Sequence, residues 1–212
     1  MKRIKIFTLF LLLLCMYVFV SAYCYAANIS ERLSDEVLRL HVIANSDSEE
    51  DQTLKYMVRD TLMNYMNSLC EDSTSKEETI EIVSNHLDDF ENLANLTINE
   101  NGFSYSAQVE LGNFEFPTKT YGDISFPAGY YDALKVKLGN AHGKNWWCVL
   151  YPSLCFINEN TGIVTDEAKK QLQQNLSEEE YNIISDKEDT SIHIKFKLIE
   201  LLAKKKLLVS KK

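Results

Sequence analysis

Residues 126–156, FPAGYYDALKVKLGNAHGKNWWCVLYPSLCF, decide the fold, because two apolar runs in this stretch have the pattern of β-strands. The first four residues predict a turn, since proline fixes φ and glycine permits positive φ. Residues 130–138 then alternate between two faces, whereas residues 146–151 are almost entirely apolar, as in a strand covered on both faces. A loop with a glycine at each end, residues 139–143, joins the two runs. The pattern predicts a hairpin at the core of a small sheet.

Upstream of this stretch, the sequence predicts one short strand followed by two amphipathic helices. Leu38–Ala44 alternates with apolar residues on both faces, and Asn45–Ser48 ends the strand and offers two serine N-caps. A helix then extends to about Cys70, with its apolar residues spaced as one stripe. Ser75, with Glu78 three positions later, has the spacing of a capping box for the second helix. Each helix therefore has one apolar side to pack against a sheet.

Further strands flank the central stretch. Phe103–Leu111 alternates as a half-buried strand, Gly112–Asn113 predicts a turn, and Phe114–Tyr121 predicts another strand. The residues after 157 predict, in order, weakly amphipathic helical turns (165–184), a last strand (192–198) and a basic helical end (200–209). Helices grouped before strands that follow in series define an α+β fold. We expect a mostly antiparallel sheet with the two early amphipathic helices packed on one face.

The N-terminal residues, Met1–Ala27, have the three parts of a secretory signal. Three basic residues precede an unbroken run of 15 uncharged, mainly apolar residues, 6–20, and small residues follow at the positions that a signal peptidase reads. The run is shorter than the about 20 residues that span a bilayer, which favours a cleaved signal peptide over an uncleaved membrane anchor, the alternative. Residues 28–212 are then expected to form a single exported domain.

The charge of the exported part argues against a nucleic-acid partner. Without Lys2, Arg3 and Lys5, the 22 basic residues of the chain become 19 against 31 acidic ones, a net charge of −12. Binding to phosphates needs a basic face, which so acidic a domain is not expected to offer. A basic cluster at Lys204–Lys206 is interpreted as a solubilising helix end, with contact to an anionic membrane as the alternative. Membrane contact is therefore expected chiefly through the N-terminal segment.

Three blocks of the sequence resemble a known family. Leu38–Ser48, LRLHVIANSDS, is similar to the opening of stage II sporulation protein R. Phe126–Leu134, FPAGYYDAL, and Asn145–Pro152, NWWCVLYP, are similar to its two other recognisable blocks. The blocks are long and specific, whereas the acidic stretch 165–189 is similar to no block. The sequence is identified by this resemblance as a member of that family.

The resemblance implies a role in intercompartmental communication during sporulation. Proteins of this family are made in the forespore of endospore-forming bacteria and exported toward the space between the two membranes. There they trigger a membrane-embedded aspartic protease of the mother cell, which removes the pro-sequence of sigma-E. The resemblance thus implies a signalling protein whose partner is that protease, with neither an enzymatic activity nor a cofactor of its own. An exported enzyme acting on the cell wall is the alternative.

The sequence predicts neither a catalytic nor a metal site. A Cys–His nucleophile would need Cys148 or Cys155 beside one of the four histidines. Cys148 lies in an apolar run, which raises the pKa of a thiol, so a structural cysteine is the favoured interpretation. For metal, no two histidines have the spacing of ligands on one helix.

A partner surface is predicted at two loops. Asn45, Ser46 and Asp47 end a strand where a helix begins, and His142 and Lys144 lie in the glycine-bounded loop. Polar residues on loops held by rigid elements are suited to contacts with a partner. The alternative is that Ser46 and Asp47 only cap the helix.

A disulfide between Cys148 and Cys155 is also predicted, because export makes such a bond chemically accessible. A turn centred on Tyr151 and Pro152 would place the two cysteines directly opposite each other in an antiparallel pair. A turn centred one residue later would leave them diagonal and harder to bridge. Two buried thiols are the alternative.

Overall fold

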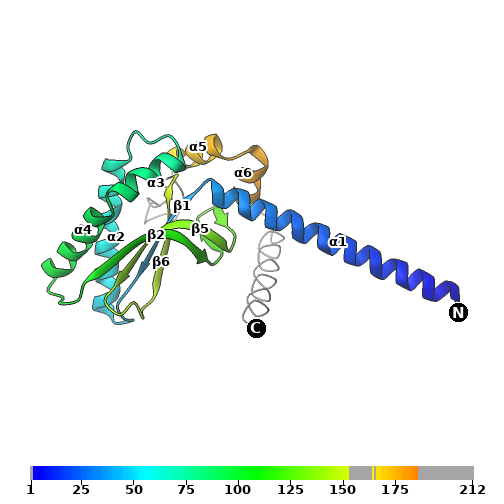
Figure 1. Cartoon of the computed structure of the whole chain (residues 1–212), viewed down its shortest axis with the longest axis horizontal. Helices are drawn as coiled ribbons and strands as arrows, with labels where there is room; N and C mark the ends of the chain where they lie inside the picture. Colours follow the sequence, from blue (N-terminus) through cyan, green and yellow to red (C-terminus); the bar gives the residue numbers. More distant parts are fainter. Residues whose placement is uncertain (1, 153–163, 165, 186–212) are drawn as a thin grey trace.

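The computed structural model describes residues 2–152, 164 and 166–185. In this part of the chain, a long N-terminal helix projects from a four-stranded sheet that has helices on both faces (Figure 1). The helices are α1 (Lys2–Asp35), α2 (Glu49–Leu69), α3 (Lys76–Asn85), α4 (Leu87–Glu100), α5 (Asp166–Asn175) and α6 (Glu178–Ser185). The strands are β1 (Leu38–Ile43), β2 (Ala107–Phe116), β3 (Lys119–Tyr121), β4 (Ile124–Phe126), β5 (Gly129–Leu138) and β6 (Asn145–Tyr151). The predicted α+β class is confirmed, whereas the strand and the basic helix predicted after residue 186 lie outside the described residues.

The strand order of the main sheet, β2-β5-β1-β6, shows that the predicted hairpin between β5 and β6 is wrong. β1 lies between these two strands, parallel to β5 and antiparallel to β6. The loop 139–144, here called the crossing loop, therefore passes over the end of β1 instead of turning back. The cause lies in β1, because five of its six residues are buried. A short strand with both faces covered is most stable at the centre of a sheet.

β2 runs through the residues for which the sequence predicts a turn. Gly112 and Asn113 stay in the ladder, where they pair with Ala133 and Asp132 of β5. The Asn113 amide donates to the Asp132 carboxylate across the strands, with an N–O distance of 3.0 Å. The chain turns later, at Gly122, where φ is +59° and the antiparallel pair β3–β4 begins to return. The predicted strand Phe114–Tyr121 is therefore the end of β2 followed by β3.

One face of the sheet packs against α2, α3 and α4. The first core lies between them and is built from aliphatic and aromatic side chains, among them Leu40, Val42, Leu54, Val58, Leu62, Phe90, Ile98, Leu134 and Val136. Full burial of one such side chain is worth about 1.5–3 kcal/mol. This cluster supplies the main apolar contacts of the fold.

Serine caps fix where the early helices begin. Ser48 Oγ accepts a hydrogen bond from Asp51 N (3.2 Å), and Ser75 Oγ accepts one from Glu78 N (3.1 Å). The second predicted helix is in fact two, because His86 (φ −118°) leaves the helical conformation between α3 and α4. The apolar stripe continues through this break, so the periodicity of the sequence could not locate it.

Within the described part of the chain, the other face of the sheet is covered at one end. The C-terminal end of α1, the β3–β4 pair, α5 and α6 gather there around a second core, which includes Leu33, Phe116, Ile124, Phe126, Tyr131, Ala133, Val149, Leu172 and Ile184. The Arg32 guanidinium pairs with the Glu180 carboxylate at 3.1 Å, which joins α1 to α6. In Figure 1, α5, α6 and the end of α1 lie near the top of the sheet, and the opposite end projects beyond them.

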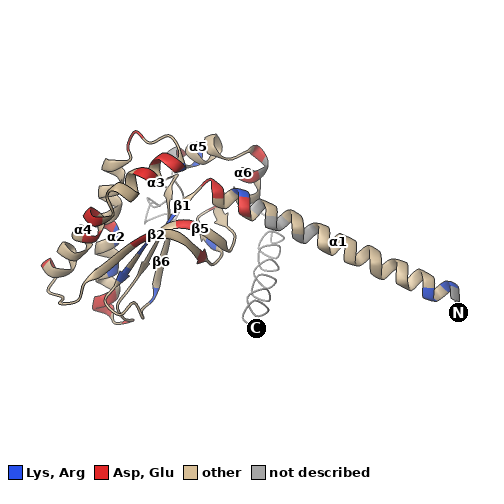
Figure 2. Cartoon of the chain, in the orientation of Figure 1, with Lys and Arg blue, Asp and Glu red and all other residues tan. Residues whose placement is uncertain are grey.

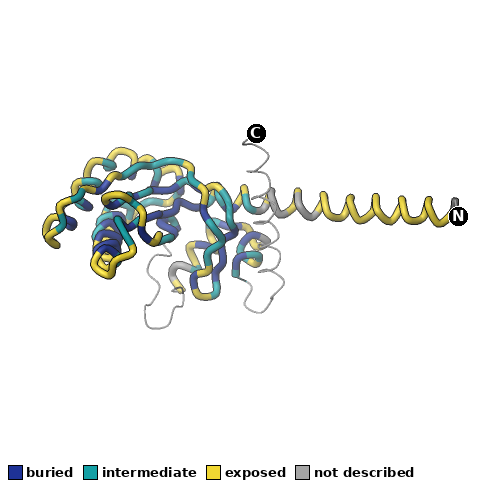
Figure 3. The backbone as a smooth tube through the Cα atoms, turned by 90° about the horizontal axis from the view of Figure 1, so that it is seen from below, coloured by how far each residue is buried: buried dark blue, intermediate teal, exposed yellow. Residues whose placement is uncertain are grey.

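α1 is apolar and exposed along most of its length. Figure 2 shows charged residues only near its two ends, and Figure 3 shows its N-terminal part fully exposed. The segment Arg3–Ser21 is long and apolar enough to cross a membrane, a test that a signal sequence also passes. Near the other end, Leu33 is fully buried and Ser30 Oγ donates to Ala128 O (3.4 Å). Cleavage near Ala27 would therefore leave the docked end of α1 on the domain.

Candidate functional site

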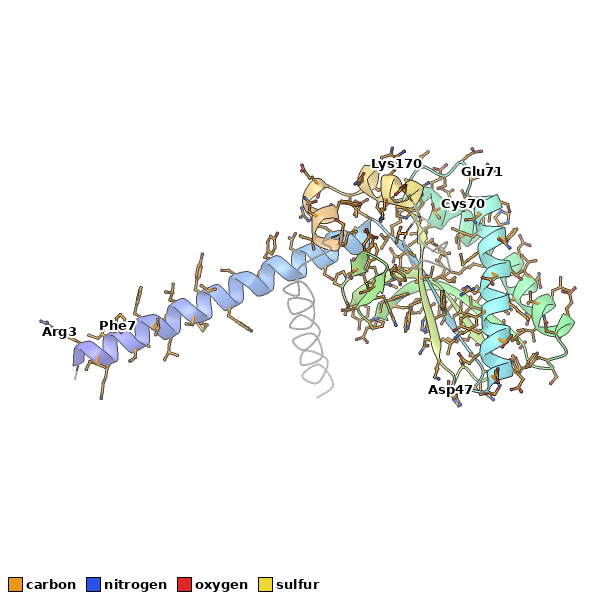
Figure 4. All side chains as sticks on the ribbon, turned by 180° about the vertical axis from the view of Figure 1, so that it is seen from behind. Arg3, Phe7, Asp47, Cys70, Glu71 and Lys170 are labelled. Atoms are coloured by element: carbon orange, nitrogen blue, oxygen red, sulfur yellow. The ribbon has the colours of Figure 1, made fainter. Side chains whose placement is uncertain are left out.

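The predicted partner surface comes together where β1 ends and α2 begins. His142 N donates a hydrogen bond to Asn45 O (3.1 Å), and Lys144 N donates one to Asp47 Oδ1 (2.7 Å). These bonds hold the crossing loop across the end of β1. Figure 4 shows Asp47 at the opposite end of α2 from Cys70, so the cluster marks one tip of the domain.

Two glycines allow the crossing loop to approach β1 closely. A Cβ on Gly143 would overlap the carbonyl oxygen of Ser46, and a Cβ on Gly139 would overlap Asn45 Oδ1. Gly139 also has φ +55°, which side chains with a Cβ rarely adopt. Gly143 N donates to Ala44 O (2.9 Å), so the contact is made by backbone on both sides. The sequence of this loop is therefore fixed by the strand that it crosses.

The buried carboxylate of Asp51 is the centre of this cluster. It accepts hydrogen bonds from Asn45 Nδ2 (2.8 Å) and Ser46 Oγ (2.5 Å) on Oδ2, and from Tyr105 Oη (2.5 Å) on Oδ1. Burial acts to raise the pKa of Asp51, but the hydrogen bonds from Ser46, Tyr105 and Asn45 together lower it below its ordinary value. The side chain is therefore ionised at neutral pH and joins α2, the end of β1 and the segment before β2.

The individual roles of the predicted residues differ. Asn45 and Ser46 are half-buried and serve to brace Asp51, whereas Asp47, His142 and Lys144 are exposed. The helix cap is Ser48, so the alternative that Ser46 and Asp47 cap α2 does not describe the structure. The exposed side chains stay a predicted partner surface.

A buried arginine lies on the second face of the sheet, at the centre of the second core. The Arg39 guanidinium is fully buried and lies over the rings of Phe116 (4.2 Å to the centroid) and Tyr131 (4.7 Å). Nη2 donates to Tyr121 Oη (2.7 Å), and Nη1 has no hydrogen-bond partner among the described residues. Cation–π contacts and the hydroxyl thus take the place of a carboxylate.

The tyrosine hydroxyl can serve Arg39 because it is neutral. Burial raises the pKa of Tyr121, although the neighbouring Arg39 acts to lower it. A protonated phenol accepts from Arg39 and also donates to the carbonyl oxygen of Trp147, at 3.2 Å. The β3–β4 pair is therefore tied to β6 through this hydroxyl.

His41 and Cys148 lie on opposite faces of the sheet. Cys148 is paired with Leu40 and belongs to the first core, whereas the His41 ring stacks on Trp147 on the second face, with centroids 3.7 Å apart. His41 Nε2 shares a hydrogen bond with Asn145 Oδ1 (2.7 Å). Burial lowers the pKa of His41 to about 4, so the ring is neutral at neutral pH. A Cys148–His41 nucleophile is excluded by this geometry.

Cys148 takes part in a disulfide bond, whereas Cys15, Cys24 and Cys70 are free. The predicted partner, Cys155, lies outside the described residues, so the pairing stays a prediction. The Tyr151–Pro152 peptide bond is cis.

Among the described residues, no group of three or more His, Cys, Asp and Glu side chains is arranged to hold a metal ion. The polar side chains at the tip brace loops, and the polar side chains on the second face pack against aromatic rings. Fold and site together define an α+β domain behind one apolar N-terminal helix, with a braced tip and a partly covered sheet face.

Comparisons with known proteins place this domain in a family. The family model of stage II sporulation protein R matches residues 34–161, from the end of α1 past β6. Stage II sporulation protein R of Bacillus subtilis (strain 168) is 33% identical to this chain over 183 residues, which cover 81% of this chain and 82% of that protein. The chain therefore belongs to the stage II sporulation protein R family, and its role is in sporulation. No solved structure matches it.

Sequence reasoning missed the two buried ionic groups that organise these sites. Asp51 was visible only as the third helical residue after a serine cap, and its contact with Tyr105 joins residues 54 positions apart. Arg39 stands in a strand whose other residues, except His41, are apolar. A charged residue at a position that alternation assigns to the interior is the signal that could have marked it.

Proposed function

We propose that this protein is an exported sporulation signal that activates a membrane-embedded aspartic protease of the mother cell, which leads to processing of pro-sigma-E. The observation that carries the proposal is membership of the stage II sporulation protein R family, over a matched region that includes β1 to β6. The apolar helix that precedes this region supports export of the domain.

The charges around the apolar segment support the orientation. Arg3 and Lys5 precede the uncharged part of α1, and positive residues stay on the cytoplasmic side of a membrane. The domain that follows Asn28 is then delivered to the opposite side. In a forespore, that side is the space between the two membranes, from which a protease embedded in the mother-cell membrane can be reached.

A ligand role accords with the geometry of the described polar groups. Asp51 has its oxygens occupied by three donors, and Arg39 is enclosed by aromatic rings. His41 is neutral and stacked, on the face opposite to Cys148. Each group serves the fold, so we propose that the protein acts by binding and not by chemistry of its own.

The test uses protoplasts of a reporter cell that makes the protease and pro-sigma-E. Purified chain beginning at Asn28 is added outside, and pro-sigma-E processing is followed by immunoblot. We expect processing that depends on the added chain and disappears when the catalytic aspartate of the protease is replaced. Processing that never responds to added folded chain would refute the proposal. Release of soluble fragments from isolated cell walls, without processing, would establish the exported wall enzyme instead.

Single substitutions distinguish further between a signalling protein and an enzyme. Changing His41, His142, His193 or Cys148 should reduce processing only as far as it reduces the folded fraction, measured by circular dichroism. A variant that is fully folded and binds the protease normally but gives no processing would indicate catalysis by that residue.

A further inference from the structure

The described residues cover the second face of the sheet over only half of its length. Alternation places Arg39, His41 and Ile43 of β1 on this face, in order from the covered end to the tip. The second core takes its sheet residues from the Arg39 end and stops at Trp147. At its edge and beyond it lies the open half-face, defined here by five partly exposed residues of the four strands that surround the buried ring of His41: Ile43, Glu110, Lys135, Lys137 and Trp147.

The register makes the open half-face continuous. His41 is paired with Lys135 on one side and with Trp147 on the other, and Lys135 is paired with Glu110. Ile43 and Lys137 form the next row toward the tip. Ile43 and Trp147 are half-buried, which leaves apolar surface beside the lysines. The His41 ring stacks on the indole ring of Trp147, so these two side chains pack against each other.

The charge of the open half-face is opposite in sign to that of the chain. Lys137 Nζ lies 2.6 Å and Lys135 Nζ 3.5 Å from the same oxygen of Glu110, so two cations share one anion. The charges that act on the His41 ring are those of Lys135, Arg39 and Lys137, all of them positive. The whole chain has a net charge of −9. Field lines from such a patch favour an approaching carboxylate.

We propose that the open half-face is a docking surface for an acidic segment of a partner protein, whose carboxylates pair with Lys135 and Lys137 and whose apolar side chains cover Ile43 and Trp147. The inference rests on the proposed function for the identity of that partner, the membrane-embedded protease. The C-terminal end of this chain is not the expected occupant, because residues 192–212 contain seven lysines and one glutamate, and a basic segment does not complement Lys135 and Lys137. The surface adjoins the tip, where Lys144 precedes the first residue of β6.

Charge variants of opposite sign test the proposal. The double variant Lys135→Gln/Lys137→Gln should raise the concentration of added chain that gives half-maximal processing at least about tenfold, since charge complementarity governs encounter. Glu110→Gln frees both lysines and should lower that concentration. A gain of this kind cannot come from misfolding. Lys170→Gln, an exposed lysine on α5, is the matched control and should leave the value within about twofold.

A second readout keeps this inference separate from the proposed function. The same variants replace the native gene in sporulating cells, and heat-resistant spores are counted at equal exported protein. If wild-type chain drives no processing in protoplasts, the proposed function fails, and the spore counts alone decide the docking surface. Wild-type behaviour of both Lys135→Gln/Lys137→Gln and Glu110→Gln in the spore assay would overturn it. Zero-length cross-linking of Lys135 or Lys137 to Asp186–Asp189 within the isolated chain would also overturn it, because the occupant would then be internal.

Discussion

The Asp51→Asn substitution keeps the shape of the side chain but removes its charge and turns one acceptor oxygen into a donor. Asp51 is 5% exposed and accepts three hydrogen bonds, so both of its oxygens are in use. Ser46 and Tyr105 can rotate their hydroxyl protons. Asn45 cannot adapt, because its Oδ1 accepts from Asn140 N (2.9 Å) and fixes Nδ2 as a donor toward Asp51. The new side chain therefore keeps the bond from Asn45 only if its NH₂ group takes the Oδ1 position, where the Tyr105 hydroxyl must accept and its own proton loses its partner.

The expected cost follows from these contacts. Hydrogen bonds to a charged group contribute about 1.5–3 kcal/mol each, and a buried donor left unpaired costs about 1–3 kcal/mol. The substitution retains two of the three bonds in weaker, uncharged form, and it relieves the burial of a charge. We expect the free energy of unfolding to fall by about 2–4 kcal/mol, which lowers Tm by about 5–15 °C in a domain of this size.

Urea unfolding of the chain that begins at Asn28 measures this loss. Glu50→Gln, in the same helical turn but exposed, is the matched control and should cost less than about 1 kcal/mol, the value of one charge near a helix N-terminus. A double-mutant cycle with Tyr105→Phe should show coupling of at least about 0.5 kcal/mol, because both residues share one bond. A loss below about 1 kcal/mol for Asp51→Asn, or strict additivity in the cycle, would refute the assignment of Asp51 as the brace of the tip.

The pH dependence of stability is an independent test of the role of Asp51. The pKa of Asp51 is lowered in the folded chain, since the hydrogen bonds outweigh burial. Its contribution to stability is thus fully present above the unfolded pKa of about 3.9 and is lost as the pH falls through the folded pKa. The gap in stability between wild type and Asp51→Asn should therefore be constant near neutral pH and narrow below about pH 4.

Arg39→Met should leave the free energy of unfolding unchanged or raise it by up to about 2 kcal/mol, because it removes the cost of an enclosed cation but keeps the packing of the stem. Arg39→Ala should lower it by about 3 kcal/mol through a cavity; equal losses in the two variants would contradict this account. Intact mass of the exported chain should increase by two hydrogens on reduction if Cys148 and Cys155 are bridged, and an unchanged mass would exclude the bond. N-terminal sequencing should find the exported chain starting near Asn28, whereas a chain starting at Met1 in the membrane fraction would identify an anchor.

Local patterns in the sequence predicted individual elements well. β1 was expected at Leu38–Ala44 and occurs at Leu38–Ile43, and β6 begins one residue before the expected position. Ser48 and Ser75 act as the caps that their spacing indicates. These features depend on contacts within a few residues, which is why one sequence is enough to find them.

The pairing of strands could not be predicted in the same way. The apolar runs of β5 and β6, separated by a short glycine-bounded loop, have the pattern of a hairpin. The insertion of β1 depends on contacts with residues 94 positions later in β5 and 102 to 113 positions later in β6, for which no local signal exists. A clue was present in β1, since apolar residues on both its faces favour a central strand. The loop at the tip could be predicted because a strand that ends where a helix begins marks a loop. The contact between Asp51 and Tyr105 could not, because these two residues come together only in the folded chain.

Substitutions in the braced tip and substitutions in the open half-face should reduce signalling for different reasons. Asp51, Asn45 and the two glycines of the crossing loop hold β1 and β6 in register, and β1 and β6 carry His41 and Trp147. A substitution in the brace should therefore reduce signalling in proportion to the folded fraction. Lys135 and Lys137 pair with Glu110, and Lys135 Nζ also lies over the Phe114 ring (4.4 Å to the centroid). Such contacts between partly exposed side chains contribute little to stability, so loss of the two lysines should reduce signalling at nearly full stability. Plotting signalling against folded fraction for both sets of variants separates a structural tip from a contact surface, because only the second set can fall below the common line.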